Sequence, residues 1–144
     1  MARRVATAVL LTVALLLAGV QAAQADDLQQ RGRRCRTEFG YEYCTFLLVN
    51  YTQHTVRAFG ELRNNTESCC AWTQSAVLLR GGNASEPTEH AGDIPGGLGR
   101  RVFAWSELHP CEASPQGYRA RISVNIGGIG RSLDSNLAET TCRR

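Results

Sequence analysis

Residues 117–126 read GYRARISVNI and contain the strongest structural signal in the chain. Apolar and polar residues alternate here, and the apolar set is Tyr118, Ala120, Ile122, Val124 and Ile126. Successive side chains of a β-strand point to opposite faces, so one face of this segment is apolar, while Arg119 and Arg121 lie on the other. The pattern predicts a strand that covers a core on one side only.

The same two-residue period recurs along the chain, and no segment shows the apolar stripe of a helix. Strand-like patterns occupy residues 41–50, 55–62, 71–79, 101–105 and 130–133. We therefore predict an all-β domain, either an antiparallel β-sandwich or an open barrel. With only 7% aromatic residues, the domain needs its large rings inside. The rings expected in the core are Trp72, Phe103, Trp105 and Tyr118.

Residues 80–99 interrupt the strand pattern with several glycines, two prolines and few apolar residues. This composition predicts a long loop. Loops of this length are uncommon inside a compact domain, so the segment is either a recognition loop or a variable connection.

The N-terminus has the organisation of a secretory signal peptide. Arg3 and Arg4 precede a mostly apolar run over residues 9–20, and Ala23-Gln24-Ala25 provides a small-x-small cleavage site. We expect residues 1–25 to be removed and the mature protein to be extracellular. Residues 26–36 are polar and rich in Arg, and they predict a mobile solvated arm, with cleavage after Arg34 as the alternative. Residues 37–144 then form a single disulfide-bonded β domain.

The charge balance excludes a general attraction to polyanions. The mature chain would hold 14 Arg and 13 Asp or Glu, with no Lys. A chain so close to neutral is not drawn as a whole to nucleic acid or to anionic membranes, and any anion site must be a local patch. Beyond residue 25 no apolar run approaches the length of a membrane span, so stable membrane insertion is not expected.

Six cysteines follow the expected cleavage site, an even number that predicts three disulfides in an oxidising compartment. They are Cys35, Cys44, Cys69, Cys70, Cys111 and Cys142. A two-residue turn at Phe39-Gly40 would place Cys35 opposite Cys44, and we predict that these two pair. Cys69 and Cys70 would then take Cys111 and Cys142, in either order. The cysteine spacings do not match a metal site, and no cofactor motif is present.

Three N-glycosylation sequons begin at Asn50, Asn64 and Asn83. All three fall in segments that the sequence predicts to be turns, where a glycan could be accommodated.

No catalytic motif is found. His54, His90 and His109 lie in predicted loops, and no nucleophile elbow or phosphate-binding loop accompanies them. We therefore expect a non-enzymatic binding module, an inhibitor or ligand-binding effector, whose partner is an extracellular protein or glycan. One alternative is a small ribonuclease that uses Glu42 and His54 with Arg119 and Arg121. The other is a membrane-acting cytolysin, for which the sequence shows neither an exposed aromatic cluster nor an amphipathic helix.

Three arginines are the predicted binding residues. Arg119 and Arg121 would lie on one face of a strand, about 7 Å apart, and could hold a carboxylate, sulfate or phosphate group. The alternative is that they pair with Asp or Glu across the sheet. Arg100, in Gly99-Arg100-Arg101, would suit the specificity pocket of a trypsin-like protease.

Overall fold

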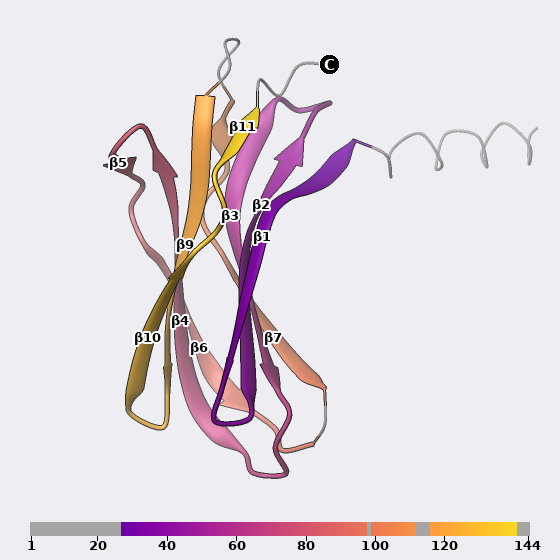
Figure 1. Cartoon of the computed structure of the whole chain (residues 1–144), viewed down its shortest axis with the longest axis vertical. Coiled ribbons are helices and arrows are strands. Elements are labelled where there is room, and N and C mark those ends of the chain that lie inside the picture. The colour runs from indigo at the N-terminus through magenta and orange to yellow at the C-terminus, as the bar shows by residue number, and fades with distance from the viewer. Residues whose placement is uncertain (1–26, 98, 112–115, 141–144) are drawn as a thin grey trace, which may run out of the picture.

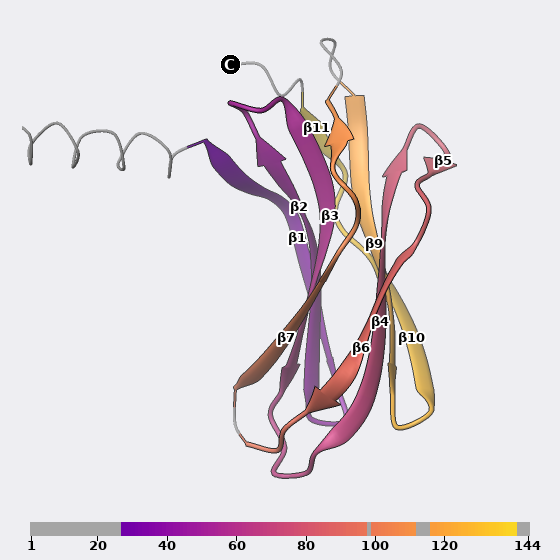
Figure 2. The ribbon, with the colours of Figure 1, turned by 180° about the vertical axis from the view of Figure 1, so that it is seen from behind.

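A computed structural model describes residues 27–97, 99–111 and 116–140, and within them every regular element is a β-strand. The strands form two antiparallel sheets that pack face to face (Figure 1), and the view from behind shows the same two layers (Figure 2). The predicted all-β antiparallel fold is therefore confirmed. The expected signal peptide, residues 1–25, lies outside the described residues, and no described helix is long and apolar enough to cross a membrane.

Sheet A is built from the first half of the chain and two later strands. Its order is β1 (Leu28–Glu38), β2 (Tyr41–Asn50), β3 (Thr55–Asn64) and β7 (Arg100–Trp105), and the short β8 (His109–Pro110) also pairs with β3. Residues 28–36 belong to β1, so the prediction of a mobile arm is wrong for them. This edge strand pairs with β2 along most of its length through backbone hydrogen bonds, which need no apolar side chains.

Sheet B contains the alternating segment of residues 117–126. Its order is β10 (Ile129–Asp134), β9 (Gln116–Ile126), β4 (Cys70–Arg80) and β5 (Asn83–Ala84); β6 (Thr88–Ile94) also pairs with β4, and β11 (Ala138–Thr140) with β9. The expected long loop over residues 80–99 is therefore wrong, because β5 and β6 occupy much of it. In β9 the predicted alternation is confirmed, with Ile122 fully buried and Arg119 and Arg121 exposed.

The core consists of the inward side chains of both sheets. Fully buried members include Leu47, Val49, Val56, Leu62, Ala76, Ile94, Tyr118 and Ile122. Trp72 and Tyr118 are in the core as predicted. Phe103 and Trp105 are not, because β7 directs the small residues Val102 and Ala104 inward and leaves the two large rings 42% and 40% exposed.

The first hairpin and its disulfide are as predicted. Phe39 and Gly40 form the turn with φ values of 51° and 81°, and Cys35 is bonded to the opposite residue, Cys44. The bonded sulfurs and Glu42 bring possible metal-ligand atoms within 4.8 Å of one another, but the disulfide leaves no thiolate to hold a metal.

The predicted bonds from Cys69 and Cys70 to Cys111 and Cys142 are wrong, because Cys69 and Cys70 carry free thiols. Cys111 is disulfide-bonded, but to neither of them, and Cys142 lies outside the described residues. The reason is distance. The backbone N–H of Cys111 donates to His54, just before β3, whereas the Cys70 thiol contacts Tyr41, which pairs with the last residue of β3. Cys111 and Cys70 therefore lie near opposite ends of β3, a ten-residue strand about 30 Å long.

The sequons differ in accessibility. Asn50 ends β2, and Asn83 is exposed in β5. Asn64 is fully buried at the end of β3, and its side-chain amide donates to the carbonyl oxygens of Ser68 and Pro95 at 2.8 and 3.1 Å. A glycan would replace one of the two amide hydrogens that make these bonds, and a fully buried side chain leaves it no space, so the expectation of glycosylation at Asn64 disagrees with the fold.

Candidate functional site

The outward surface of sheet A carries a cluster that we call the aromatic–arginine face. It consists of Arg33, Phe46, Phe59, Glu61, Arg101, Phe103 and Trp105. Strand register creates it: Phe46, Phe59 and Trp105 are directly opposed on β2, β3 and β7. Glu61 and Phe103 form the next opposed pair on the same face.

Phe59 lies at the centre of the four rings and contacts each of the other three. Its centroid lies 5.1 Å from Phe46, 5.7 Å from Phe103 and 6.1 Å from Trp105. These separations are typical of aromatic pairs that attract each other beyond the burial of their area. Phe46 is buried, whereas Phe103 and Trp105 are exposed. The result is a band of rings across three strands that water reaches on the β7 side.

A single carboxylate organises the positive charge beside the rings. Glu61 is only 4% exposed, and its oxygens lie 2.9 Å from Arg33, 3.3 Å from Arg101 and 3.8 Å from Arg63. Three guanidinium groups share the Glu61 carboxylate, and Glu42, which lies opposite Arg63 in the sheet, adds a second carboxylate to the same face. Among these residues three arginines therefore face two carboxylates. The Arg33 guanidinium also lies 5.3 Å from the ring centroid of Phe46, a cation–π arrangement. Positive charge and aromatic surface therefore meet at one place.

His90 supports Trp105, one of the two exposed rings of the face, from the other sheet. It lies on β6, its ring centroid is 4.4 Å from that of Trp105, and its Nε2 is 3.2 Å from the Trp105 carbonyl oxygen. The contact ties β6 to β7 and restricts the orientation of the indole. An aromatic side chain that is held in place before binding loses less entropy when a partner covers it.

The structure does not bring together the three arginines predicted from the sequence. The guanidinium of Arg121 donates to both carboxylate oxygens of Asp134, at 2.7 and 2.9 Å, so the alternative expectation of pairing across the sheet is correct for Arg121. This pair raises the pKa of Arg121 and lowers that of Asp134. Arg119 lies beside it on the outside of sheet B, along a hollow of about 500 Å³. Arg100 lies on sheet A, opposite Asn64 at the other end of the molecule.

The residues of the ribonuclease hypothesis are also separated. Glu42 and His54 belong to sheet A and its β2–β3 turn, whereas Arg119 and Arg121 face outward from sheet B. The two pairs therefore lie on opposite layers, and no single substrate phosphate could contact both.

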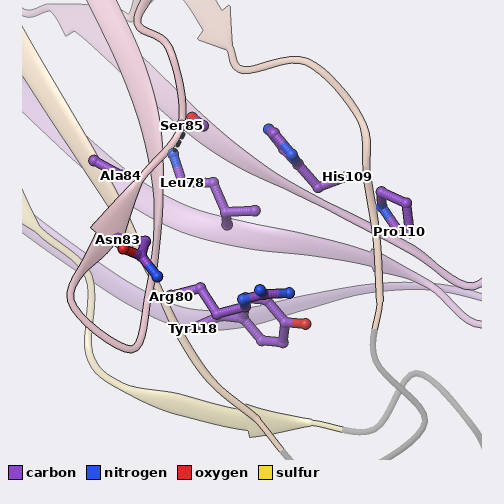
Figure 3. A pocket seen from close by; sticks show the side chains of 8 residues that line it. All are labelled: Leu78, Arg80, Asn83, Ala84, Ser85, His109, Pro110 and Tyr118. Carbon is purple, nitrogen blue, oxygen red and sulfur yellow. Dashed lines mark hydrogen bonds between the residues drawn. The ribbon is translucent and has the colours of Figure 1, made fainter.

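A second hollow, of about 310 Å³, lies between β4, β5 and β8 (Figure 3). Leu78, Arg80, Asn83, Ala84, Ser85, His109, Pro110 and Tyr118 line it. None of the three arginines predicted to bind a partner is among them. The Ser85 hydroxyl accepts a hydrogen bond from the Leu78 backbone, so part of this wall closes the β4–β5 turn.

Sequence reasoning missed the aromatic–arginine face because it assigned Phe103 and Trp105 to the core. The signal that could have identified it is Arg101. In a strand over residues 101–105, Arg101 shares its face with Phe103 and Trp105, while Val102 and Ala104 share the other. A charged residue on that face indicates that it points to solvent.

Comparison with known proteins adds little. No family model matches the chain, and no curated protein matches it. Among solved structures, the solution structure of R. palustris CsgH matches with a TM-score of 0.33 and 11% identity, over 76% of this chain and 91% of that chain. A likeness of that size carries no functional argument.

Proposed function

We propose that this protein is a secreted, non-enzymatic binding module, and that its aromatic–arginine face binds an acidic surface of an extracellular protein. The observation that carries the proposal is the juxtaposition of exposed Phe103 and Trp105 with Arg33 and Arg101 on a sheet. Trp, Phe and Arg are the residue types enriched in protein–protein contacts, and Trp and Arg dominate their binding energy.

Two features favour a protein over a small ligand. The rings lie side by side across three strands rather than around a cavity, and small-molecule sites are concave. The excess of arginine over carboxylate around Glu61 favours an acidic partner, since complementary charge speeds association and selects against basic surfaces. Secretion is supported by the Cys35–Cys44 disulfide, which is typical of proteins from oxidising compartments.

The test is capture from the extracellular fluid of the producing organism by the immobilised protein. Trp105→Ala is compared with wild type and with Leu137→Ala, a matched control in which another exposed apolar residue, 52% exposed, is removed outside the face. We expect a captured protein that the control retains and that Trp105→Ala binds at least about tenfold more weakly, about 1.4 kcal/mol. Binding should also weaken with added salt.

Equal capture by both variants would overturn the proposal, and so would specific binding to an acidic glycan with no captured protein. The cytolysin hypothesis becomes more concrete as well, because the structure contains the exposed aromatic cluster that the sequence did not reveal. Leakage of dye from anionic lipid vesicles, lost in Trp105→Ala and retained in Leu137→Ala, would assign the face to membranes instead.

A further inference from the structure

Two adjacent free thiols stand out in this disulfide-bonded protein. Cys35, Cys44 and Cys111 are all disulfide-bonded, whereas Cys69 is exposed with a free thiol and Cys70 is half-buried with another. An unpaired cysteine in a secreted chain indicates either an intermolecular bond or a reactive thiol.

The two thiols are directed apart. Along β4 the inward residues are Trp72, Gln74 and Ala76, so Cys70 shares the inward side, where the Tyr41 hydroxyl donates to its sulfur at 3.2 Å. This hydrogen bond is the main cause of the raised pKa of Tyr41. Cys69 precedes the strand and is exposed. Because neighbouring side chains of extended backbone diverge, a Cys69–Cys70 bond would require the start of β4 to leave the sheet.

The same end of the molecule presents apolar side chains to solvent. We call it the hairpin end: the β1–β2, β3–β4 and β9–β10 turns, which lie together in both ribbon views (Figures 1 and 2). The first two turns are joined, because the backbone N–H of Asn65 donates to the Gly40 carbonyl oxygen at 2.9 Å. Phe39 is 73% exposed at the tip of the first, and Ile129 is 46% exposed beside the third.

Phe39 occupies a conformation that aromatic residues rarely adopt. Its φ of 51° places it in the left-handed region, where Asn or Gly would be unstrained. Beside it lies a mostly apolar hollow of about 50 Å³, lined by Phe39 itself, Tyr41, Tyr43, Ile126 and Ile129, with the ion pair of Glu38 and Arg131 at its rim. The Arg131 guanidinium lies 6.0 Å from the centroid of the Phe39 ring. A strained, protruding ring next to an apolar hollow gives one surface both a projection and a recess.

We propose that the hairpin end is the contact between two copies of this chain, and that a disulfide between the two Cys69 residues closes it. A symmetric dimer uses the same patch twice, so projection and recess must both be on that patch, as they are here. The thiolate of one Cys69 attacks a low-molecular-weight disulfide such as oxidised glutathione, releasing one thiol and leaving a mixed disulfide. The second Cys69 displaces the other thiol, so that two protein thiols are oxidised and one small disulfide is reduced.

The dimer extends the proposed function without depending on it. Two copies joined at the hairpin end would carry two aromatic–arginine faces, and a partner with repeated sites would be held through both of them.

The test is the mass of the purified protein in a glutathione redox buffer, by non-reducing electrophoresis and intact-mass spectrometry. We expect a dimer that reductant dissociates, that Cys69→Ser abolishes, and that the matched variant Cys70→Ser retains. Phe39→Asn, which suits the left-handed turn and so preserves the fold, should lower the dimer yield at least about fivefold at equal protein concentration.

Three results would overturn the proposal. They are a monomer in which Cys69 is bonded to Cys70, a monomer that keeps both thiols free under oxidising conditions, and a dimer that persists in Cys69→Ser. A dimer that forms equally well in Phe39→Asn would show random thiol oxidation rather than a specific contact. Partner capture by the Cys69→Ser monomer tests the aromatic–arginine face separately.

Discussion

At the scale of single residues, the Arg121–Asp134 pair makes stability depend on pH. The hydrogen bond from Arg121 is the largest cause of the lowered pKa of Asp134. A carboxylate whose pKa is lower in the folded state contributes stability above its unfolded pKa, and this is lost as the pH falls through the folded value. We expect Arg121→Gln to unfold at a lower temperature near neutral pH and to approach wild type at about pH 2. Thermal unfolding followed across this range checks it.

Asp134→Asn provides the control for that prediction. It removes the titrating group instead of its partner, so it should flatten the same acid-dependent loss of stability. If both variants lose stability on acidification as steeply as wild type does, the pair is not what makes the fold acid-sensitive.

Glu61 is the residue on which the aromatic–arginine face depends most. Its replacement by Gln leaves Arg33, Arg63 and Arg101 close together without their shared carboxylate. Breaking a fully buried ion pair costs several kcal/mol, and these arginines are partly exposed, so we expect a loss of about 1 to 3 kcal/mol. Urea unfolding measures it, and added salt should reduce the difference by screening the repulsion. Equal stability of Glu61→Gln and wild type in urea would mean that solvent already stabilises the three arginines.

At the scale of elements, the packing of β3 against sheet B requires a glycine. A Cβ atom added at Gly60 would meet the Gln74 side-chain nitrogen and lie 2.7 Å from the Ile122 side chain. Such overpacking typically costs about 1 to 3 kcal/mol, so Gly60→Ala should unfold at lower urea concentration. Combining Gly60→Ala with Gln74→Ala removes the clash with Gln74. The double variant should therefore lose less stability than the sum of the losses in the two single variants. Strict additivity would argue against this close approach.

Elements with their own core-facing pattern could be predicted from the sequence, and the mostly exposed edge strands β1 and β6 could not. β9 alternates over its whole length, and the Phe39-Gly40 turn predicts both its hairpin and the Cys35–Cys44 bond. β1 and β6 are mostly exposed and contribute few side chains to the core, so their polar sequences resemble an arm and a loop. Their strand character comes from backbone pairing with β2 and β4, which side-chain patterns do not record.

The candidate site was missed for a related reason. Its side chains come from four strands, and only the register of sheet A places Phe59 between Phe46 and Trp105. Each short segment contains one or two aromatic residues, which a pattern assigns to a core by default. The sequence could not predict the free thiols of Cys69 and Cys70 either. They are free because Cys70 lies near the last residue of β3, whereas Cys111 lies near the first.

At the scale of the whole molecule, the Cys35–Cys44 disulfide connects stability to the proposed function. It fixes β1 to β2 two residues from Arg33, which clamps Glu61. The free edge of β1 is joined to sheet B by a 2.9 Å hydrogen bond from the Asn136 backbone N–H to the Gly32 carbonyl oxygen. Loosening β1 should therefore disturb the aromatic–arginine face and one seam between the sheets, while the β4–β9 pairing in sheet B stays intact.

Replacing both Cys35 and Cys44 with Ser tests this connection. A crosslink that closes a short loop contributes about 2 to 3 kcal/mol, so the variant should unfold at correspondingly lower denaturant concentration. Hydrogen exchange should accelerate first in β1, with β9 remaining protected until global unfolding. Replacing Cys69 and Cys70 with Ser is the matched control, and the monomer should lose little stability because it forms no disulfide through them and a serine hydroxyl at position 70 can still accept the hydrogen bond from Tyr41. Uniform acceleration across both sheets would show that β1 does not open separately, and that the disulfide stabilises the sandwich as one cooperative unit.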